Sequence, residues 1–234
     1  MVKTGLVLLP GLDGTGLLFA DFVAALGPDL DPIVVRYPPD APLGYAELEP
    51  LVRKSLPSGN PFLLLGESFA GPLAISIAAS APPGLVGLIL CCSFASNPRP
   101  CLGKLAFLSP YLPVRGFPRS IFAKYFMGRF ASQDLASKLA KASEHVAPDV
   151  FRYRIRAVCG VDYSAKLRQL RVPILYLRAS MDRIVPRSAS KRIKRLAPST
   201  RIVEIDAPHY LLQARPEAAV ATVSEFAREL LPGG

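Results

Sequence analysis

FLLLGESFAG, residues 62–71, is the stretch that decides how the rest of the chain is interpreted. It opens with four apolar residues, runs through Ser68 between small residues, and leads into an apolar segment of helical length. A continuous apolar run is typical of a strand that is covered on both faces. Small residues two positions to either side of a serine let a strand and a helix approach each other around a tight turn. The stretch therefore predicts a buried strand, a sharp turn that presents Ser68, and a helix.

Similar apolar runs recur along the chain and alternate with segments of helical length. The runs expected to be strands are Leu6 to Leu9, Ile33 to Val35, Phe62 to Leu65, Val86 to Cys91, Ile174 to Leu177 and Ile202 to Ile205. The segments expected to be helices are Leu17 to Leu26, Tyr45 to Leu56, Phe69 to Ala79, Ser188 to Leu196 and Pro216 to Leu231. This alternation predicts an α/β fold with a mostly parallel sheet of about six strands and helices on both faces.

The alternation fails between about Asn97 and Leu170. A connection of this length inside a compact domain needs structure of its own. Ser132 to Val146 supplies some, because apolar residues recur there at helical spacing behind a serine suited to cap a helix. Seven aromatic residues lie just upstream: Phe107, Tyr111, Phe117, Phe122, Tyr125, Phe126 and Phe130. We expect a helical cap at residues 97–170, inserted into a core of residues 1–96 and 171–234. The alternative is an additional helical layer with no pocket beneath it.

Ser68 can act as a nucleophile only if a neighbouring base takes its proton, so the hypothesis requires a histidine. The chain contains two, His145 and His209. His145 falls in the expected cap helix, where a surface or pocket-lining role is the simpler interpretation. His209 follows the last expected strand, and Asp182 follows the strand before it. Asp206, three residues before His209, is the alternative acid.

The GESFAG motif, together with Asp182 and His209, resembles the α/β-hydrolase family, in particular its small bacterial carboxylesterases with a helical cap. In that family a G-x-S-x-G turn joins a strand to a helix, and the triad follows the chain order Ser, Asp, His. Ala70 replaces the second glycine here, which is a departure of one methyl group. The resemblance implies that Ser68 is the nucleophile, His209 the base, and Asp182 the acid that orients the imidazole.

The same resemblance implies an oxyanion hole built from two backbone N–H groups. One belongs to Phe69, directly after the nucleophile, and the other to Leu12 in the glycine-rich stretch LPGLDGTG, residues 9–16. Pro10 stands where many relatives carry His, which matters little to a backbone donor. The stretch matches neither G-x-G-x-x-G nor G-x-x-x-x-G-K-[ST], so a nucleotide site is not expected. We expect no metal and no cofactor, because a Ser-His-Asp mechanism needs neither.

The resemblance implies an enzyme that cleaves small-molecule carboxylic esters with apolar acyl groups. Acyltransferases and thioesterases on the same fold remain alternatives, since fold alone does not separate them. A catalytically silent member that binds a ligand under its cap is a further alternative. The chain starts directly at the strand before the oxyanion loop, so we expect it to lack the pair of antiparallel strands with which many relatives begin.

Charge and hydropathy bear on partners and location. The formal net charge is +10, and the densest basic cluster contains no interleaved aromatic residues that could stack on bases. That cluster comprises Arg183, Arg187, Lys191, Arg192, Lys194 and Arg195. We interpret it as a solvated helix face and expect no nucleic-acid partner. No uncharged apolar run is long enough to span a membrane, and the N-terminal run is too short for a secretion signal. We therefore expect no stable membrane insertion and a cytoplasmic protein; the sequence specifies no oligomeric state.

The chain has four cysteines, Cys91, Cys92, Cys101 and Cys159. Their positions follow no metal-ligand spacing, and the first two lie in an apolar run expected to be a strand. We expect buried, reduced thiols.

Overall fold

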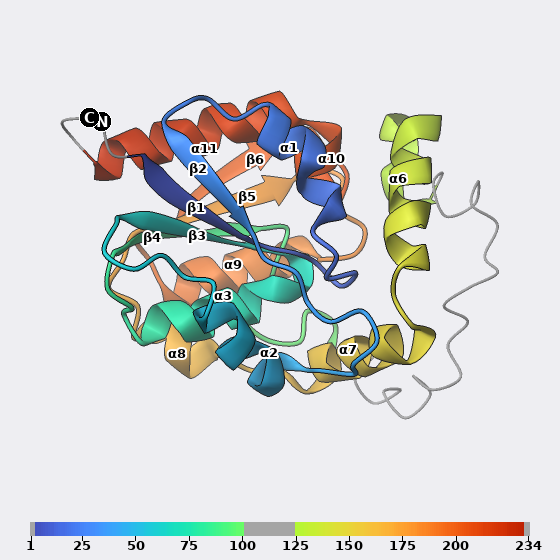
Figure 1. Ribbon diagram of the computed structural model, residues 1–234, viewed down its shortest axis with the longest axis horizontal. Coiled ribbons are helices and arrows are strands. Elements are labelled where there is room, and N and C mark those ends of the chain that lie inside the picture. Colours follow the sequence, from blue (N-terminus) through green and yellow to red (C-terminus); the bar gives the residue numbers. More distant parts are fainter. Residues whose placement is uncertain (1–2, 101–124, 232–234) are drawn as a thin grey trace.

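A computed structural model describes residues 3–100 and 125–231 and contains a six-stranded parallel sheet (Figure 1). The strands are β1 (Thr4–Leu9), β2 (Leu30–Val34), β3 (Phe62–Glu67), β4 (Leu85–Cys91), β5 (Ile174–Ala179) and β6 (Arg201–Ile205). They lie in the order β2-β1-β3-β4-β5-β6, and each neighbouring pair is parallel. The sheet expected from the sequence is confirmed, and all six apolar runs contribute a strand.

Helices cover both faces of this sheet (Figure 1). One face carries α2 (Tyr45–Arg53), α3 (Gly71–Ala79), α8 (Ser164–Arg168) and α9 (Arg187–Leu196). The other carries the short helix η1 (Leu17–Phe19), α1 (Ala20–Ala24), α10 (Leu211–Ala214) and α11 (Pro216–Leu230). Successive residues of β3 enter different cores, with Leu64 in the first and Leu63 in the second. Both faces of the strand must therefore be apolar, which explains its continuous apolar run.

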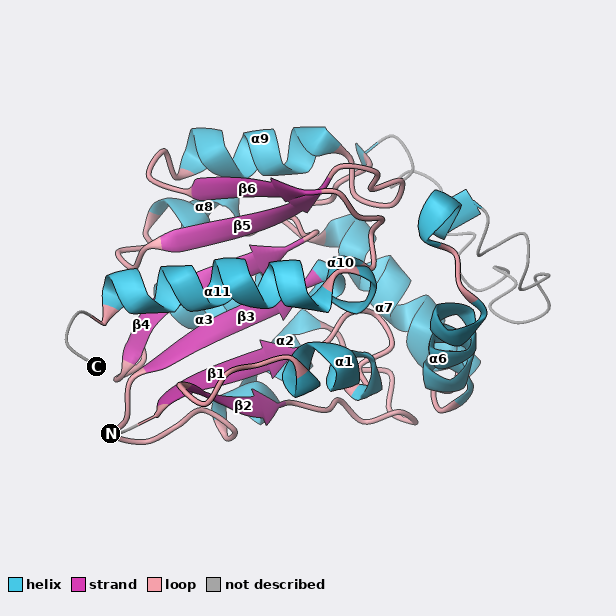
Figure 2. Ribbon diagram, turned by 90° about the horizontal axis from the view of Figure 1, so that it is seen from above, coloured by secondary structure: helices cyan, strands magenta, loops and turns pink. Residues whose placement is uncertain are grey.

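In the described part of the connection between β4 and β5, α8 is preceded by η4 (Gly128–Phe130), α6 (Gln133–Glu144) and α7 (Pro148–Gly160). The Ser132 hydroxyl accepts a 3.1 Å hydrogen bond from the N–H of Leu135, so it caps α6 as expected. The helix α7 is absent from our sequence prediction. Figure 2 shows α6 and α7 beyond the carboxyl ends of the strands. By contrast, α8 packs against α3 and α9 in the helical layer of the sheet.

Of the seven aromatic residues expected in the cap, Tyr125, Phe126 and Phe130 are described. Tyr125 is 56% exposed, and the Phe130 ring lies beside the guanidinium groups of Arg129 and Arg215. The other four, Phe107, Tyr111, Phe117 and Phe122, lie outside the described residues.

The expectations for the basic cluster and for the cysteines are met by some of their residues and not by others. Arg187, Lys191, Arg192, Lys194 and Arg195 are exposed on α9, whereas Arg183 lies in the loop before that helix. Cys91 and Cys92 are buried free thiols, Cys159 is a partly exposed one, and Cys101 is outside the described residues. Among the residues described, none of the helices has both the length and the apolar character needed to cross a bilayer. The cytoplasmic location stays a prediction.

Candidate active site

Ser68 lies in a strained turn between β3 and the short helix η2 (Ser68–Ala70), which leads into α3. Its φ angle is 49°, in the left-handed region that residues with a side chain rarely adopt. The turn is also crowded. A Cβ atom on Gly66 would come within 2.8 Å of the Ala74 Cβ atom and 2.9 Å of the Ala70 carbonyl oxygen. Gly66, two positions before Ser68, is therefore required by the close approach of helix and strand, as the sequence motif indicates.

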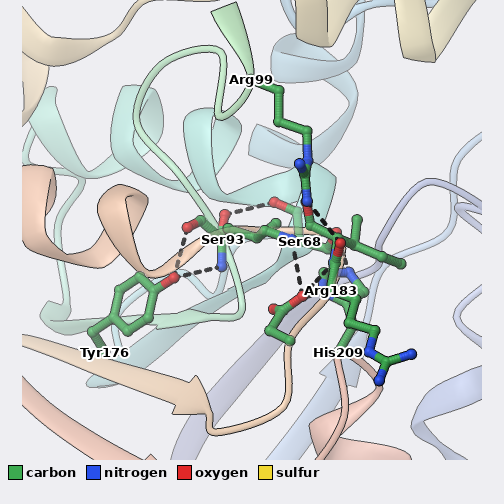
Figure 3. Close-up of polar contacts among 9 residues, drawn as sticks. Ser68, Ser93, Arg99, Tyr176, Arg183 and His209 are labelled. Atoms are coloured by element: carbon green, nitrogen blue, oxygen red, sulfur yellow. Dashed lines mark hydrogen bonds and ion pairs between the residues drawn. The ribbon is translucent and has the colours of Figure 1, made fainter. Parts of the chain in front are cut away.

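The end of β4 supports this turn from the side (Figure 3). The hydroxyl of Ser93 donates a 2.5 Å hydrogen bond to the carbonyl oxygen of Ser68. Ser93 is in turn held by Tyr176 of β5, whose hydroxyl accepts from the Ser93 N–H at 3.0 Å and donates to the Ser93 carbonyl at 2.7 Å. The strained turn is thus fastened to two neighbouring strands.

Ser68, His209 and Asp182 form one hydrogen-bonded chain. The Ser68 Oγ atom lies 2.8 Å from Nε2 of His209, and the other ring nitrogen, Nδ1, lies 2.9 Å from Oδ2 of Asp182. Each side chain follows the carboxyl end of a different strand, namely β3, β6 and β5. The side chains of His209 and Asp182 are each only 6% exposed. This arrangement can remove a proton from the serine hydroxyl and stabilise the imidazolium that results.

The loop that carries Asp182 is held on several sides. Oδ1 of Asp182 accepts hydrogen bonds from the N–H groups of Ile184 at 2.9 Å and Val185 at 2.8 Å. The guanidinium of Arg99 donates to the carbonyl oxygens of Ile184 and Arg183 at 3.1 and 2.7 Å (Figure 3). Oδ2 is left for the imidazole, so the carboxylate has one orientation. Our sequence prediction missed Arg99, because an exposed arginine in a long connection carries no signal of its own.

Asp206 and His145, the alternative acid and the second histidine, both lie on the surface. The Asp206 carboxylate pairs with Arg129 and accepts a hydrogen bond from the Ser180 hydroxyl. His145 is exposed, and its Nδ1 atom lies 2.6 Å from the carbonyl oxygen of Lys141. The structure brings neither of them to Ser68.

The two residues expected to supply the oxyanion hole lie beside the serine. Phe69 follows it directly in η2, and at the start of a helix its N–H has no intrahelical partner. The loop with Leu12 runs alongside, because a Cβ atom on Gly11 would lie 3.8 Å from the Cβ atom of Ser68. The Phe69 ring stacks on Tyr45 at 4.7 Å between centroids, which fixes its side chain in the core.

Cys92 lies next to the Asp182–His209 pair, and the ligand atoms of the three residues are within 4.8 Å of one another. These residue types can bind a metal ion. Two of the three are already engaged with each other, since Nδ1 of His209 and Oδ2 of Asp182 are in hydrogen-bond contact. A metal ion here would have to break the contact that orients the imidazole.

Glu67 is a buried acid directly before the serine, which our sequence prediction did not single out. The side-chain N–H of Gln213 donates a 3.0 Å hydrogen bond to Oε1 of Glu67. The Gln213 side-chain oxygen is buried without a hydrogen-bond partner among the described residues. Burial raises the pKa of Glu67 to about 7; repulsion from Asp13 acts in the same direction, while the Gln213 hydrogen bond and His209 oppose it. The group is thus partly protonated near neutral pH.

Comparisons with known proteins agree with this fold. A family model described as "Alpha/beta hydrolase family" matches residues 6–223. A hydrolase from Pseudomonas aeruginosa superposes with a TM-score of 0.80 at 19% identity, covering 96% of this chain and 90% of that one. An enol-lactonase from Burkholderia xenovorans gives 0.75 at 17% identity, with 97% and 92% covered. A lipase-esterase related protein from Clostridium acetobutylicum gives 0.78 at 14% identity, with 95% and 94% covered. At these identities the likeness shows the fold alone.

One curated protein is similar in sequence, the polyketide synthase ThaQ of Burkholderia thailandensis. It is 28% identical over 247 aligned positions, which include 96% of this chain. The chain spans only 12% of the length of that protein.

Proposed function

The chain belongs to the alpha/beta hydrolase family, and we propose that it is a serine hydrolase that cleaves carboxylic esters with apolar acyl groups through an acyl-enzyme. The observation that carries the proposal is the continuous contact from Ser68 Oγ through the His209 imidazole to the Asp182 carboxylate, at 2.8 and 2.9 Å. A base within hydrogen-bond reach of the nucleophile, itself oriented by a third group, is the geometry that acyl transfer requires.

The reaction follows from these positions. As Ser68 Oγ attacks the ester carbonyl carbon, His209 Nε2 accepts the hydroxyl proton and Asp182 stabilises the imidazolium. The negative oxygen of the tetrahedral intermediate accepts hydrogen bonds from the N–H groups of Leu12 and Phe69. His209 then protonates the departing alkoxide. A water molecule, deprotonated by the same imidazole, attacks the acyl-serine. The bond from the acyl carbon to Ser68 Oγ then breaks, the acid leaves, and His209 returns the proton to Oγ.

We further propose that the inserted segment, through α6 and α7, acts as a cap over the site, whereas α8 at its end belongs to the helical layer of the sheet. Apolar residues of this segment pack against residues of the site and its neighbours. Leu135 and Leu139 of α6 cluster with Leu18 and Tyr210, the latter next to His209. Val150 and Phe151 of α7, with Val146, cluster with Leu12. An apolar cover favours apolar acyl groups, because burial of hydrocarbon away from water is favourable.

Thioester cleavage, or transfer of the acyl group to an acceptor other than water, is the second candidate function. The similarity to part of a protein named as a polyketide synthase favours it. Both reactions use the same acyl-serine and differ only in the leaving group or the acceptor, so the same residues serve them.

The test is hydrolysis of p-nitrophenyl esters of graded acyl length by wild type, Ser68→Ala and His209→Ala. We expect both variants to lose nearly all turnover, by about 10⁴-fold or more, because the nucleophile and the base act as a unit. His145→Ala is the matched control, since His145 is exposed, and it should retain full activity. Equal turnover in wild type and Ser68→Ala would refute the proposal.

A competition assay separates the candidate reactions. An oxygen ester and the thioester of the same acid are offered together, with and without an added alcohol acceptor. Faster release of the thiol favours the thioesterase, and formation of a new ester favours the transferase.

A further inference from the structure

Arg154 of α7 is a fully buried arginine whose guanidinium contacts backbone carbonyl groups. Its side chain is 0% exposed. Nη1 donates to the carbonyl oxygens of Leu12 at 3.0 Å and Asp13 at 2.9 Å, and Nη2 donates to that of Pro38 at 3.0 Å. Within residues 3–100 and 125–231 it forms no ion pair. Its hydrogen-bond partners are all neutral, and the Asp13 carboxylate attracts it without forming an ion pair. A buried charge of this kind adds little net stability. Its importance therefore lies in what it holds in place.

The segment that Arg154 holds is the loop beside Ser68. A hydrogen bond from the Gly14 N–H to the Gly11 carbonyl, at 3.1 Å, closes a turn over residues 11–14. Arg154 binds both carbonyls inside that turn, and its guanidinium lies 5.4 Å from the centre of the Tyr37 ring. A Cβ atom on Gly14 would come within 2.6 Å of Nη1, so a glycine is needed for this approach.

Leu12 is therefore fixed at both its backbone and its side chain by one helix. Its carbonyl is bound by Arg154, and its side chain packs against Val150 and Phe151 at the start of the same helix and against Val146 just before it. The Leu12 N–H lies in the same peptide plane as the Gly11 carbonyl, which accepts the hydrogen bond from the Gly14 N–H that closes the turn. Arg154 holds the next two peptide planes of the turn, so little rotation is left for the plane that carries the Leu12 N–H. The direction of the Leu12 N–H thus depends on where α7 lies.

We propose that Arg154 is a positioning residue that clamps the loop of residues 11–14, so that the Leu12 N–H is aimed at the oxyanion formed on Ser68. The inference rests on the proposed function, since an oxyanion forms only if Ser68 attacks an acyl carbonyl. It also links α7, in the proposed cap, to stabilisation of the transition state. A displacement of α7 would weaken catalysis without touching Ser68 or His209.

The experiment compares Arg154→Gln and Arg154→Lys with Arg156→Gln, an exposed arginine on the same helix. Lysine keeps the buried positive charge but lacks the forked guanidinium that donates to three carbonyls. Arg154→Lys therefore serves as the test if Arg154→Gln does not fold. All proteins are assayed as folded material, judged by far-UV circular dichroism. We expect kcat to fall by about 10- to 100-fold in both Arg154 variants and KM to change by less than about threefold, because a misaimed oxyanion donor weakens the transition state alone.

Two further readouts distinguish a change in the direction of the Leu12 N–H from a general loss of stability. Phenylboronic acid forms a tetrahedral adduct with an active serine, and its Ki should rise by about the same factor as kcat/KM falls. Hydrogen exchange of residues 11–16 should be faster in both Arg154 variants than in wild type, whereas Arg156→Gln should match wild type in every readout. Exchange does not depend on turnover, so it tests the clamp even if the wild type hydrolyses no ester, a result that would refute the proposed function separately.

Unchanged exchange of residues 11–16 in the folded Arg154 variants would overturn the clamp. Faster exchange with kcat within twofold of wild type would overturn its role in catalysis. The same holds if activity falls only in proportion to the folded fraction.

Discussion

Replacement of Glu67 by glutamine should make the protein more stable at alkaline pH and remove a pH dependence of its stability. Glu67 is 6% exposed and lies at the end of β3, directly before Ser68. Glutamine has nearly the same shape as a protonated glutamic acid and can still accept the hydrogen bond from Gln213. The substitution therefore isolates the effect of ionising this carboxyl group.

The magnitude follows from the pKa of the carboxyl group. Burial raises the pKa of Glu67 from an ordinary 4.5 to about 7 in the folded protein. The folded state then binds the proton more tightly than the unfolded state, so stability is greatest at low pH and falls as pH rises from about 4.5 to about 7. A difference of this size corresponds to about 3 kcal/mol in the free energy of unfolding. Above pH 7, Glu67→Gln should exceed wild type by up to that amount, and near pH 4.5 the two should be nearly equal.

The assay is urea unfolding of wild type and variant at intervals between pH 4.5 and 8.5. Groups that do not interact with Glu67 contribute equally to both proteins, so the difference between their free energies of unfolding reports on Glu67 and its coupling to Asp13 and His209. Glu217→Gln, at an exposed position in α11, is the control and should follow wild type at every pH. A difference between Glu67→Gln and wild type that stays constant from pH 4.5 to 8.5 would refute the reasoning.

Three further predictions concern the site and its supports. Asp182→Asn should lower kcat for ester hydrolysis by about 10⁴-fold, because the imidazole loses its orienting carboxylate, whereas Asp206→Asn should change it by less than about twofold; the reverse order in the same assay would show that the acid is misassigned. Tyr176→Phe should lower the free energy of unfolding in urea by about 1–3 kcal/mol, since two buried backbone groups lose their partner, and no loss would contradict the network. Gly66→Ala should lower the thermal midpoint and the activity together, while Gly160→Ala, with no atom within 4 Å of the added methyl group, should leave both near wild type; equal behaviour of the two variants would argue against crowding in the turn.

The parts of the fold that the sequence predicts are those with strong local signals. The runs in β3, β4 and β5 are continuous because helices cover both faces of the sheet. The first edge strand is less regular, and the sequence placed it at Ile33 to Val35 rather than at Leu30–Val34. Pro32 lies inside it, which is tolerated because an edge strand has one side without a partner strand.

The sequence did not predict α7 or the role of Arg154, because both depend on tertiary contacts that a local pattern does not show. The helix α7 starts at Pro148, a residue favoured at the first helical position, but Arg152, Arg154 and Arg156 alternate with its apolar residues and obscure the apolar stripe. Arg154 looks like any other basic residue of this segment. Its carbonyl partners are more than 100 positions away in the chain, so nothing in its neighbourhood marks it as buried.

The position of β4 explains why the candidate site could be located from sequence while its support could not. Ser68 follows β3, whereas Asp182 and His209 follow β5 and β6, so β4 separates the serine from the other two along the sheet. Parallel strands end at one edge, and side chains that directly follow strands can therefore be brought together by position alone. The end of β4 fills the gap with Cys92 beside the acid and Ser93 against the serine turn. A cysteine and a serine after a strand match no motif. Their position between the serine turn and the acid follows only from the order of the strands in the sheet.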